Sequence, residues 1–137
     1  ILQLSYKNDL DGILDFVFKN ILIRNLKSLK TTEIEKQIEN HFALYNDDFL
    51  PLCFLDNHDT NRLMYECRGD KKLFTKALTI LSKIKFPQII YYGTEQAMTH
   101  RTSIKYNIAH SDLVVRKALN WNKEFEFKSV IRQLFNK

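Results

Sequence analysis

The sequence predicts an α/β fold built on a parallel sheet, because apolar runs of strand length alternate with stretches of helical periodicity. Successive strands joined by helices pair in parallel through right-handed crossovers. Two of the predicted strands run directly into polar clusters, at residues 57–59 and 94–96. Both clusters are therefore expected at one edge of the sheet, which favours an arc of a (β/α)8 TIM barrel over half of a doubly wound sheet.

The first strand–helix unit is predicted within the first third of the chain. Residues 12–18 form a β-branched and aromatic run, and the periodicity changes toward that of a helix over residues 20–26. A further helix follows, and the capping-box spacing of Thr32 and Glu35 marks its start. The apolar face of this helix is predicted to carry Ile34, Ile38, Phe42 and Tyr45.

Two more strand–helix units follow. The apolar run at residues 52–55 is typical of a buried strand, and Asp70 is the predicted N-cap of the next helix. Pro87 ends that helix, since proline cannot continue it. Residues 88–92 form the third apolar run, and a last amphipathic helix is predicted over residues 127–135.

Composition excludes several classes of function. The 137 residues suit one ordinary domain, and a hydrophobic content of 45% is enough to fill a core. With only 3 glycines and no Gly-rich phosphate loop, the sequence gives no support to nucleotide binding. The net charge of +5 is spread among acidic residues, which indicates a solvated basic surface rather than a nucleic-acid site. Cys53 and Cys67 are too few and too loosely spaced for a zinc site, so no metal ligands are assigned.

The sequence also lacks the usual signals of membrane insertion and export. It contains no signal peptide and no stretch of about 18 apolar residues, so no membrane partner is expected. The first residue is Ile1 rather than Met, and the chain is therefore expected to be a piece of a longer protein. Cytoplasmic and secreted locations both stay open.

The segment Asn57-His58-Asp59 is the strongest functional signal in the sequence. Placing a carboxylate and an imidazole at the end of a buried strand is costly unless they are paired. The alternative interpretation is a polar loop with one turn aspartate and a surface histidine. Asp56, on the alternate face, is interpreted as structural. Other polar side chains nearby have two open interpretations, as rim residues or as solvated or structural groups: Arg62, Glu95 and Gln96.

Four segments of the sequence together resemble the α-amylase superfamily, glycoside hydrolase family 13. Residues 54–62 are similar to the family's fourth conserved region, in which the seventh barrel strand ends in Asn-His-Asp. Residues 10–16 resemble its sixth-strand segment Asp-Gly-Val-Leu-Asp-Phe, and residues 87–96 resemble its eighth-strand segment Pro-x-Ile-Tyr-Tyr-Gly-x-Glu. Arg116 and Trp121 lie where the family often has Asn-Arg-Glu-Pro-Met-x-Trp. Because the segments occur in the family's order along nearly the whole chain, the chain is identified as a member.

The resemblance implies that the chain holds roughly strands six to eight of the barrel with their helices, the C-terminal portion of a catalytic domain. The family's nucleophilic aspartate and acid/base glutamate follow the fourth and fifth strands, and no Gly-Phe-Arg-x-Asp sequence occurs here. The complete protein is then expected to hydrolyse α-glucosidic bonds with retention, in starch, maltooligosaccharides or related glucans. This chain alone is expected to be inactive.

By the same resemblance, Asp59 is the carboxylate that stabilises the oxocarbenium-like transition state. His58 is expected to donate to hydroxyls of the same sugar, and Asn57 to fix the loop that aims both side chains. Asp112 and Arg116 have the spacing at which many family members hold sugars in the next subsites. The intervening residues are Leu-Val-Val rather than Pro-x-Asn, so a simple i, i+4 ion pair stays an equal alternative.

The partners implied by the resemblance are an α-glucan substrate and the N-terminal part of the barrel, in cis or as another chain. Three strand–helix units leave sheet edges unpaired, so the isolated chain is expected to be unstable. No cofactor is expected in this chain. The family's usual calcium site draws on upstream segments, so calcium concerns only the complete protein. The alternative function is a non-catalytic amylase-like barrel that binds carbohydrate or serves as an ancillary subunit, although the intact Asn-His-Asp favours the enzyme.

Overall fold

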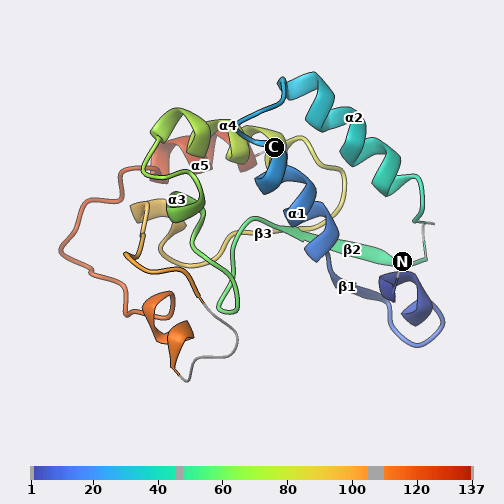
Figure 1. Cartoon of the computed structure of the whole chain (residues 1–137), viewed down its shortest axis with the longest axis horizontal. Helices are drawn as coiled ribbons and strands as arrows, with labels where there is room; N and C mark the ends of the chain where they lie inside the picture. Colours follow the sequence, from blue (N-terminus) through green and yellow to red (C-terminus); the bar gives the residue numbers. More distant parts are fainter. Residues whose placement is uncertain (1, 46–47, 105–109, 137) are drawn as a thin grey trace.

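The computed structural model describes residues 2–45, 48–104 and 110–136 (Figure 1). The elements follow one another in this order: η1 (Leu2–Tyr6), β1 (Gly12–Leu14), α1 (Phe16–Asn25), α2 (Thr31–Phe42), β2 (Leu50–Phe54), α3 (Leu63–Glu66), α4 (Lys71–Ser82), β3 (Gln88–Ile89), η2 (Thr94–Gln96), η3 (Ser111–Val114) and α5 (Lys128–Phe135). The three elements labelled η are short 3₁₀-helices.

The three strands form one parallel sheet in the order β1-β2-β3. Gly12 lies opposite Leu50 in the first pair, and Cys53 lies opposite Gln88 in the second. The parallel α/β sheet predicted from the sequence is thus confirmed. Because all three strands point the same way, the residues that follow them meet at one edge.

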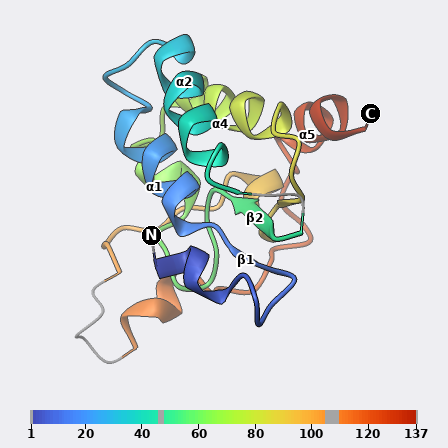
Figure 2. The same cartoon turned by 90° about the vertical axis from the view of Figure 1, so that its right-hand side faces the viewer.

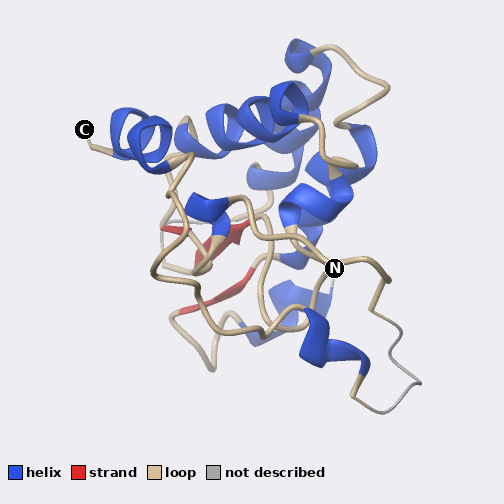
Figure 3. Ribbon diagram, turned by 90° about the vertical axis from the view of Figure 1, so that its left-hand side faces the viewer, coloured by secondary structure: helices blue, strands red, loops and turns tan. Residues whose placement is uncertain are grey.

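The longer helices α1, α2 and α4 gather on one side of the sheet (Figures 1 and 2). Figure 3 shows the strands in red beneath this group of helices. The apolar faces of the helices and the strand β2 together form the core, whose members include Phe18, Leu22, Ile34, Ile38, Cys53, Leu55, Phe74, Leu78, Leu81 and Phe127. The helical faces predicted from periodicity therefore face the core, fully buried along much of α2 and α4 and partly buried along α5.

Asp15 divides the first apolar run, so β1 is shorter than the run predicted over residues 12–18. Its Oδ1 accepts a hydrogen bond from the Phe18 N–H at 2.9 Å, which makes Asp15 the N-cap of α1. Its Oδ2 lies 2.8 Å from Nε2 of the buried His41 on α2. The fully buried Asp15 carboxylate thus follows the end of β1, caps the start of α1 and contacts α2 through His41.

The predicted capping box of α2 is wrong by two residues. The helix begins at Thr31 with Lys30 as its N-cap, and the Lys30 N–H donates to Glu33 Oε2 at 2.8 Å. Glu35 instead forms an ion pair with Lys83 Nζ at 2.7 Å, across to the end of α4. Glu33 and Glu35 each lie three residues after a possible N-cap residue, Lys30 and Thr32 respectively. The spacing alone therefore did not identify the start of the helix.

The N-cap predicted for α4 is confirmed. Asp70 Oδ1 accepts from the N–H groups of Lys72 at 2.8 Å and Leu73 at 3.1 Å. The last predicted helix is also present as α5, with Phe127 as its N-cap residue. Among the described residues, no helix combines the length and apolarity that crossing a membrane requires.

The third strand is shorter than the predicted run of residues 88–92, since only Gln88 and Ile89 pair with β2. The chain then turns at Gly93, which adopts the left-handed conformation with φ of 83°. The Met98 N–H donates to the Gly93 carbonyl at 2.9 Å and closes the turn around η2. A Cβ atom on Gly93 would clash with the Met98 side chain, which would have to move, so glycine suits this turn in space as well as in conformation.

Gly93→Ala is expected to destabilise the folded protein more than Gly69→Ala does. Both glycines have positive φ, so each alanine incurs a conformational cost of about 1–2 kcal/mol. Only Gly93 adds a clash, since nothing lies within 4 Å of the Cβ position of Gly69. Thermal unfolding of the complete protein carrying each variant measures the difference, which is expected to be about 1 kcal/mol or more.

Removal of the clashing side chain provides the control. In a Met98→Ala background, the extra loss caused by Gly93→Ala is expected to disappear. Equal losses for Gly93→Ala and Gly69→Ala in the original background would contradict the close packing of Met98 against this turn.

Candidate active site

The loop that follows β2 carries the Asn57-His58-Asp59 motif, and Asn57 shapes its turn. Asn57 Oδ1 accepts a hydrogen bond from the Asp59 N–H at 2.9 Å. The Asn57 N–H donates to Thr60 Oγ1 at 2.9 Å, and the Thr60 N–H donates back to the Asn57 carbonyl at 3.3 Å. An asparagine side chain that bonds to the backbone two residues later is a usual way to build a tight turn. The buried Asn57 and Thr60 thus present His58 and Asp59 to solvent.

His58 and Asp59 form a pair whose side chains are 55% and 50% exposed. His58 Nε2 lies 3.2 Å from Asp59 Oδ2. The other oxygen, Asp59 Oδ1, accepts from Arg116 Nη2 at 3.1 Å, and Arg116 Nε donates to the His58 carbonyl at 3.1 Å. The guanidinium group therefore contacts both the side chain and the backbone of the motif.

Arg116 also forms an ion pair with Asp112, at 3.0 Å between Nη2 and Oδ2, which was the alternative interpretation of their spacing. The spacing is i, i+4, but Asp112 belongs to the 3₁₀-helix η3 and Arg116 lies just beyond it. The same nitrogen that binds Asp112 also binds Asp59. The structure thus brings the five predicted site residues together, and their roles toward a substrate stay predictions: Asn57, His58, Asp59, Asp112 and Arg116.

Asp56, one residue before the motif, is buried with 3% exposure. Its Oδ2 accepts from the Leu63 N–H at 2.9 Å, and its Oδ1 accepts from Thr94 Oγ1 at 3.3 Å. Burial raises the pKa of the Asp56 carboxyl to about 6, while the Leu63 hydrogen bond and the Arg62 charge act in the opposite direction. The structural interpretation of Asp56 is consistent with these contacts.

Arg62 is not the solvated rim residue that its polarity allowed, because only 1% of it is exposed. Its guanidinium carbon lies 4.2 Å from the centre of the Tyr91 ring and 4.8 Å from that of Tyr92. Nη1 donates to the Tyr92 carbonyl, and the Arg62 backbone N–H donates to His100 Nε2 at 3.1 Å. Nε and Nη2 have no hydrogen-bond partner within the described ranges. The two consecutive tyrosines that follow β3 are the feature of the sequence that could have indicated such cation–π stacking.

Gln96 is likewise an interior residue rather than a rim residue, with 1% exposure. Its Nε2 donates to the carbonyls of Asn120 at 2.7 Å and Lys123 at 3.2 Å. The neighbouring Glu95 carbonyl accepts from the Phe127 N–H at 2.9 Å. This segment therefore anchors the loop that leads into α5.

The exposed part of this cluster offers a carboxylate, an imidazole and a guanidinium group within contact of one another. Such a set can accept from and donate to the hydroxyls of a polar ligand, and its carboxylate can stabilise a positive charge that develops nearby. In the part of the chain that the structure describes, no group of three or more His, Cys, Asp or Glu side chains could hold a metal ion.

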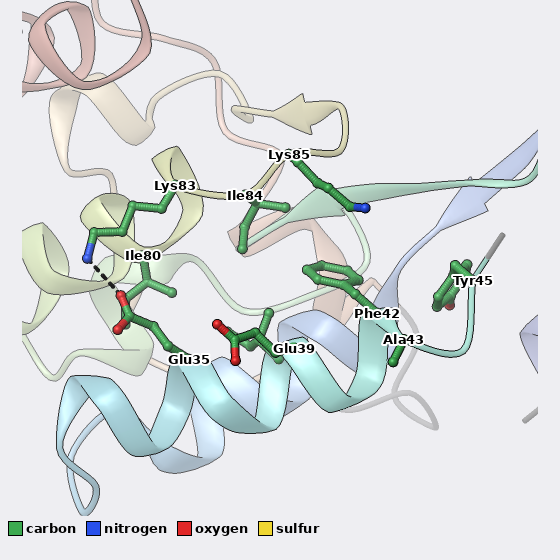
Figure 4. A pocket seen from close by; sticks show the side chains of 10 residues that line it. Glu35, Glu39, Phe42, Ala43, Tyr45, Ile80, Lys83, Ile84 and Lys85 are labelled. Atoms are coloured by element: carbon green, nitrogen blue, oxygen red, sulfur yellow. Dashed lines mark hydrogen bonds and ion pairs between the residues drawn. The ribbon is translucent and has the colours of Figure 1, made fainter. Parts of the chain in front are cut away.

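A hollow of about 720 Å³ lies between α2 and the end of α4 (Figure 4). Its floor is apolar, and the Glu35–Lys83 ion pair crosses one end of it. None of the five candidate site residues lines it. Since none of the candidate site residues lines this hollow and its Glu35 and Lys83 are paired with each other, we assign the chemistry to the motif at the sheet edge.

Comparison with known proteins gives a consistent result. Residues 4–131 match the family described as "Alpha amylase, catalytic domain". The chain is 31% identical to Alpha-amylase 2 of Dictyoglomus thermophilum over 131 residues, which are 93% of this chain and 23% of that protein. It is 33% identical over 90 residues to a cyclomaltodextrin glucanotransferase of Geobacillus stearothermophilus, covering 64% of this chain and 12% of that protein. The chain therefore spans about a quarter of the length of the first relative and less of the second.

The fold is also found in solved structures. The ligand-free cyclic α-maltosyl-(1→6)-maltose hydrolase of Arthrobacter globiformis superposes with a TM-score of 0.74 at 18% identity, over 96% of this chain and 30% of that one. The similarity predicted from the four sequence segments is thus confirmed over nearly the whole chain. The chain belongs to the α-amylase catalytic-domain family.

Proposed function

We propose that this chain supplies strands six to eight of a (β/α)8 barrel in an enzyme that hydrolyses α-glucosidic bonds with retention. The proposed substrates are starch, maltooligosaccharides or related α-glucans. Support comes from the family match and from relatives that are named as an amylase and a cyclomaltodextrin glucanotransferase. The three parallel strands, with the motif directly after the middle one, fit the end of such a barrel.

The observation that carries the proposal is the half-exposed Asp59 carboxylate at the carboxyl edge of the parallel sheet. In retaining hydrolysis one carboxylate attacks the anomeric carbon and another protonates the leaving oxygen. Asp59 performs neither step in this proposal. It stabilises the positive charge that develops on the sugar ring, an attraction that is greatest in the transition state.

The neighbours of Asp59 bind the sugar in this proposal. His58 donates to hydroxyls of the ring in the cleavage subsite, and Asn57 fixes the turn that aims both side chains. The Arg116–Asp59 pair is 42% and 50% exposed, and exposed ion pairs contribute only about 0–1 kcal/mol. A sugar can therefore replace Arg116 at Asp59, while Asp112 keeps the guanidinium group nearby for hydroxyls of the next subsite.

The rest of the barrel is the proposed partner of this chain, in cis or as another chain. β1 pairs with a neighbour only on its β2 side among the described elements, so one edge stays open. Beside this edge lies a hollow of about 590 Å³ lined largely by apolar side chains, among them Leu10, Ile13 and Phe16. Open strand edges and exposed apolar surface both favour further pairing.

Asp59→Asn in the complete protein is expected to lower kcat on maltooligosaccharides about 10³-fold, with a smaller effect on KM. The amide keeps the shape of the side chain and removes the negative charge that the transition state needs. Steady-state kinetics measure the two effects separately. Asp48→Asn is the matched control, since Asp48 is an exposed aspartate at the opposite end of β2. Unchanged kcat in Asp59→Asn would exclude Asp59 from the chemistry.

Arg116→Gln is expected to raise KM about tenfold while kcat changes less. Glutamine keeps hydrogen-bonding capacity but loses the charge and the forked donors that contact Asp59 and Asp112. A kcat loss as large as that of Asp59→Asn, with KM unchanged, would show that Arg116 acts on the reacting centre and not in a neighbouring subsite.

The isolated chain is expected to show no turnover of starch or maltooligosaccharides and no cooperative melt as a monomer. It lacks the family's nucleophile segment, and the β1 edge needs a partner strand. Activity assays and calorimetry on the purified chain test both points. Turnover by the chain alone would overturn the residue assignment.

A complete protein that binds maltooligosaccharides without hydrolysing them would support a non-catalytic, amylase-like function instead.

A further inference from the structure

The two ends of the Asn57-His58-Asp59 loop are fastened in the protein interior. At the first end, Asp56 is 3% exposed, and its carboxylate accepts from the Leu63 N–H at 2.9 Å. Leu63 is the first residue of α3, beyond the other end of the loop. The Asp56 carboxylate therefore closes the loop, because one hydrogen bond joins the residue before the loop to a residue seven positions later, beyond its other end.

The same loop is fastened to the segment after β3. Thr94 Oγ1 donates to Asp56 Oδ1 at 3.3 Å, and Arg62 Nη1 donates to the Tyr92 carbonyl. Arg62 stacks on Tyr91 and Tyr92 at 4.2 and 4.8 Å from the ring centres. The loop that follows β2 is thus fixed against the chain that follows β3 by a buried anion and a buried cation.

Asp56 and Arg62 share no hydrogen bond among the described atoms, but their charges attract one another. Arg62 keeps two nitrogens without partners within the described ranges, so nearby negative charge is needed to compensate its burial. Replacing one charge would leave the other buried and uncompensated. Each of the two buried charges therefore requires the other. The turn that presents His58 and Asp59 lies between Asp56 and Arg62 in the sequence.

We propose that Asp56 and Arg62 are positioning residues that hold the Asp59 carboxylate in its productive place, an inference that rests on the proposed function of this site. Neither side chain reaches the sugar, since both are buried. Their effect on the reaction is geometric. A displacement of about 1 Å at a reacting centre can cost about 10²-fold in rate.

The protonation of Asp56 supports this inference. Burial, the largest effect, raises its pKa to about 6, and the charged or titratable groups that face it are Lys19 on α1, Arg62 on the loop, Cys67 after α3 and Tyr91 after β3. The unfolded chain ionises first, so between the ordinary value of 3.8 and about 6 ionisation of Asp56 reduces the free energy of unfolding. A charge that costs stability at neutral pH is consistent with a role in positioning.

Asp56→Asn in the complete protein is expected to lower kcat on maltooligosaccharides by roughly 10- to 100-fold at pH 7.5, the effect of a small displacement of the Asp59 carboxylate. KM is expected to change by less than about threefold. The amide has nearly the same shape, so the core keeps its packing. Thr94→Val, which removes one donor to the carboxylate, is expected to cost about two- to fivefold in kcat.

Asp70→Asn is the matched control, because Asp70 also accepts backbone hydrogen bonds, but it caps α4 and lies beyond the loop. It is expected to lower stability while kcat stays within about twofold of the original. If Asp56→Asn and Thr94→Val both changed kcat no more than Asp70→Asn does, the positioning role would be wrong.

The pH dependence provides a readout that a purely structural role would not move. Near pH 5 the Asp56 carboxyl of the original protein is mostly neutral, as the amide always is. The kcat ratio of the original protein to Asp56→Asn is therefore expected to fall about tenfold between pH 7.5 and pH 5. Titrating groups that do not interact with Asp56 affect both proteins alike and cancel in the ratio. A ratio that stays constant over this range would contradict the role of the charge.

Hydrogen exchange separates this inference from the proposed function. In Asp56→Asn the backbone amides of residues 57–63 are expected to exchange at least about tenfold faster than in the original protein, whereas those of α4 stay protected. If the original protein hydrolyses no α-glucan, the proposed function fails, and this exchange result still decides whether Asp56 fixes the loop. Unchanged exchange in an active protein would overturn the positioning role alone.

Discussion

The buried Asp56 carboxylate is the contact on which the placement of the candidate site depends. It ties the end of β2 to the first residue of α3 and to Thr94 in the segment that follows β3. With both loop ends fixed in this way, the turn itself needs only the local hydrogen bonds of Asn57 and Thr60. A rigid base beneath a short exposed turn is the arrangement that a charge-stabilising carboxylate needs, because its effect depends on position.

The carboxyl edge of the sheet carries several acidic side chains, and their contacts differ according to whether they are buried or exposed. Asp15, after β1, is fully buried, where it caps α1 and holds His41 of α2. Asp56, after β2, is also buried and fixes a loop. Only Asp59 reaches solvent among these three, in contact with the partly exposed His58 and Arg116. Two of these three carboxylates at the ends of parallel strands therefore have structural contacts, and only the third is open to a ligand.

Much of the fold follows from local patterns that the sequence shows directly. The alternation of strands and helices, the Asp70 cap and the polar end of β2 were all predicted, since each depends on residues close in the chain. The predicted extent of β3 was wrong, because its pairing stops after Ile89 and Gly93 begins a turn. The start of α2 was also misplaced, since two glutamates offered the same cap spacing.

The contacts that define the site lie further apart in the sequence. Arg116 reaches Asp59 across 57 positions, and Thr94 reaches Asp56 across 38. The sequence predicted which residues follow the strands, but it did not show which of them turn inward. Arg62 is the clearest case, because its polarity left rim, solvated and structural roles open, and its stacking on Tyr91 and Tyr92 depends on a distant segment of the chain.

The most direct test is a crystal structure of the complete protein with a bound maltooligosaccharide. We expect Asp59 and His58 to contact hydroxyls of the same sugar ring and Arg116 to have left Asp59 for the neighbouring sugar or for Asp112. Asp56 is expected still to accept from the Leu63 N–H. An oligosaccharide bound elsewhere on the barrel, with the Arg116–Asp59 pair intact beside an empty site, would contradict it.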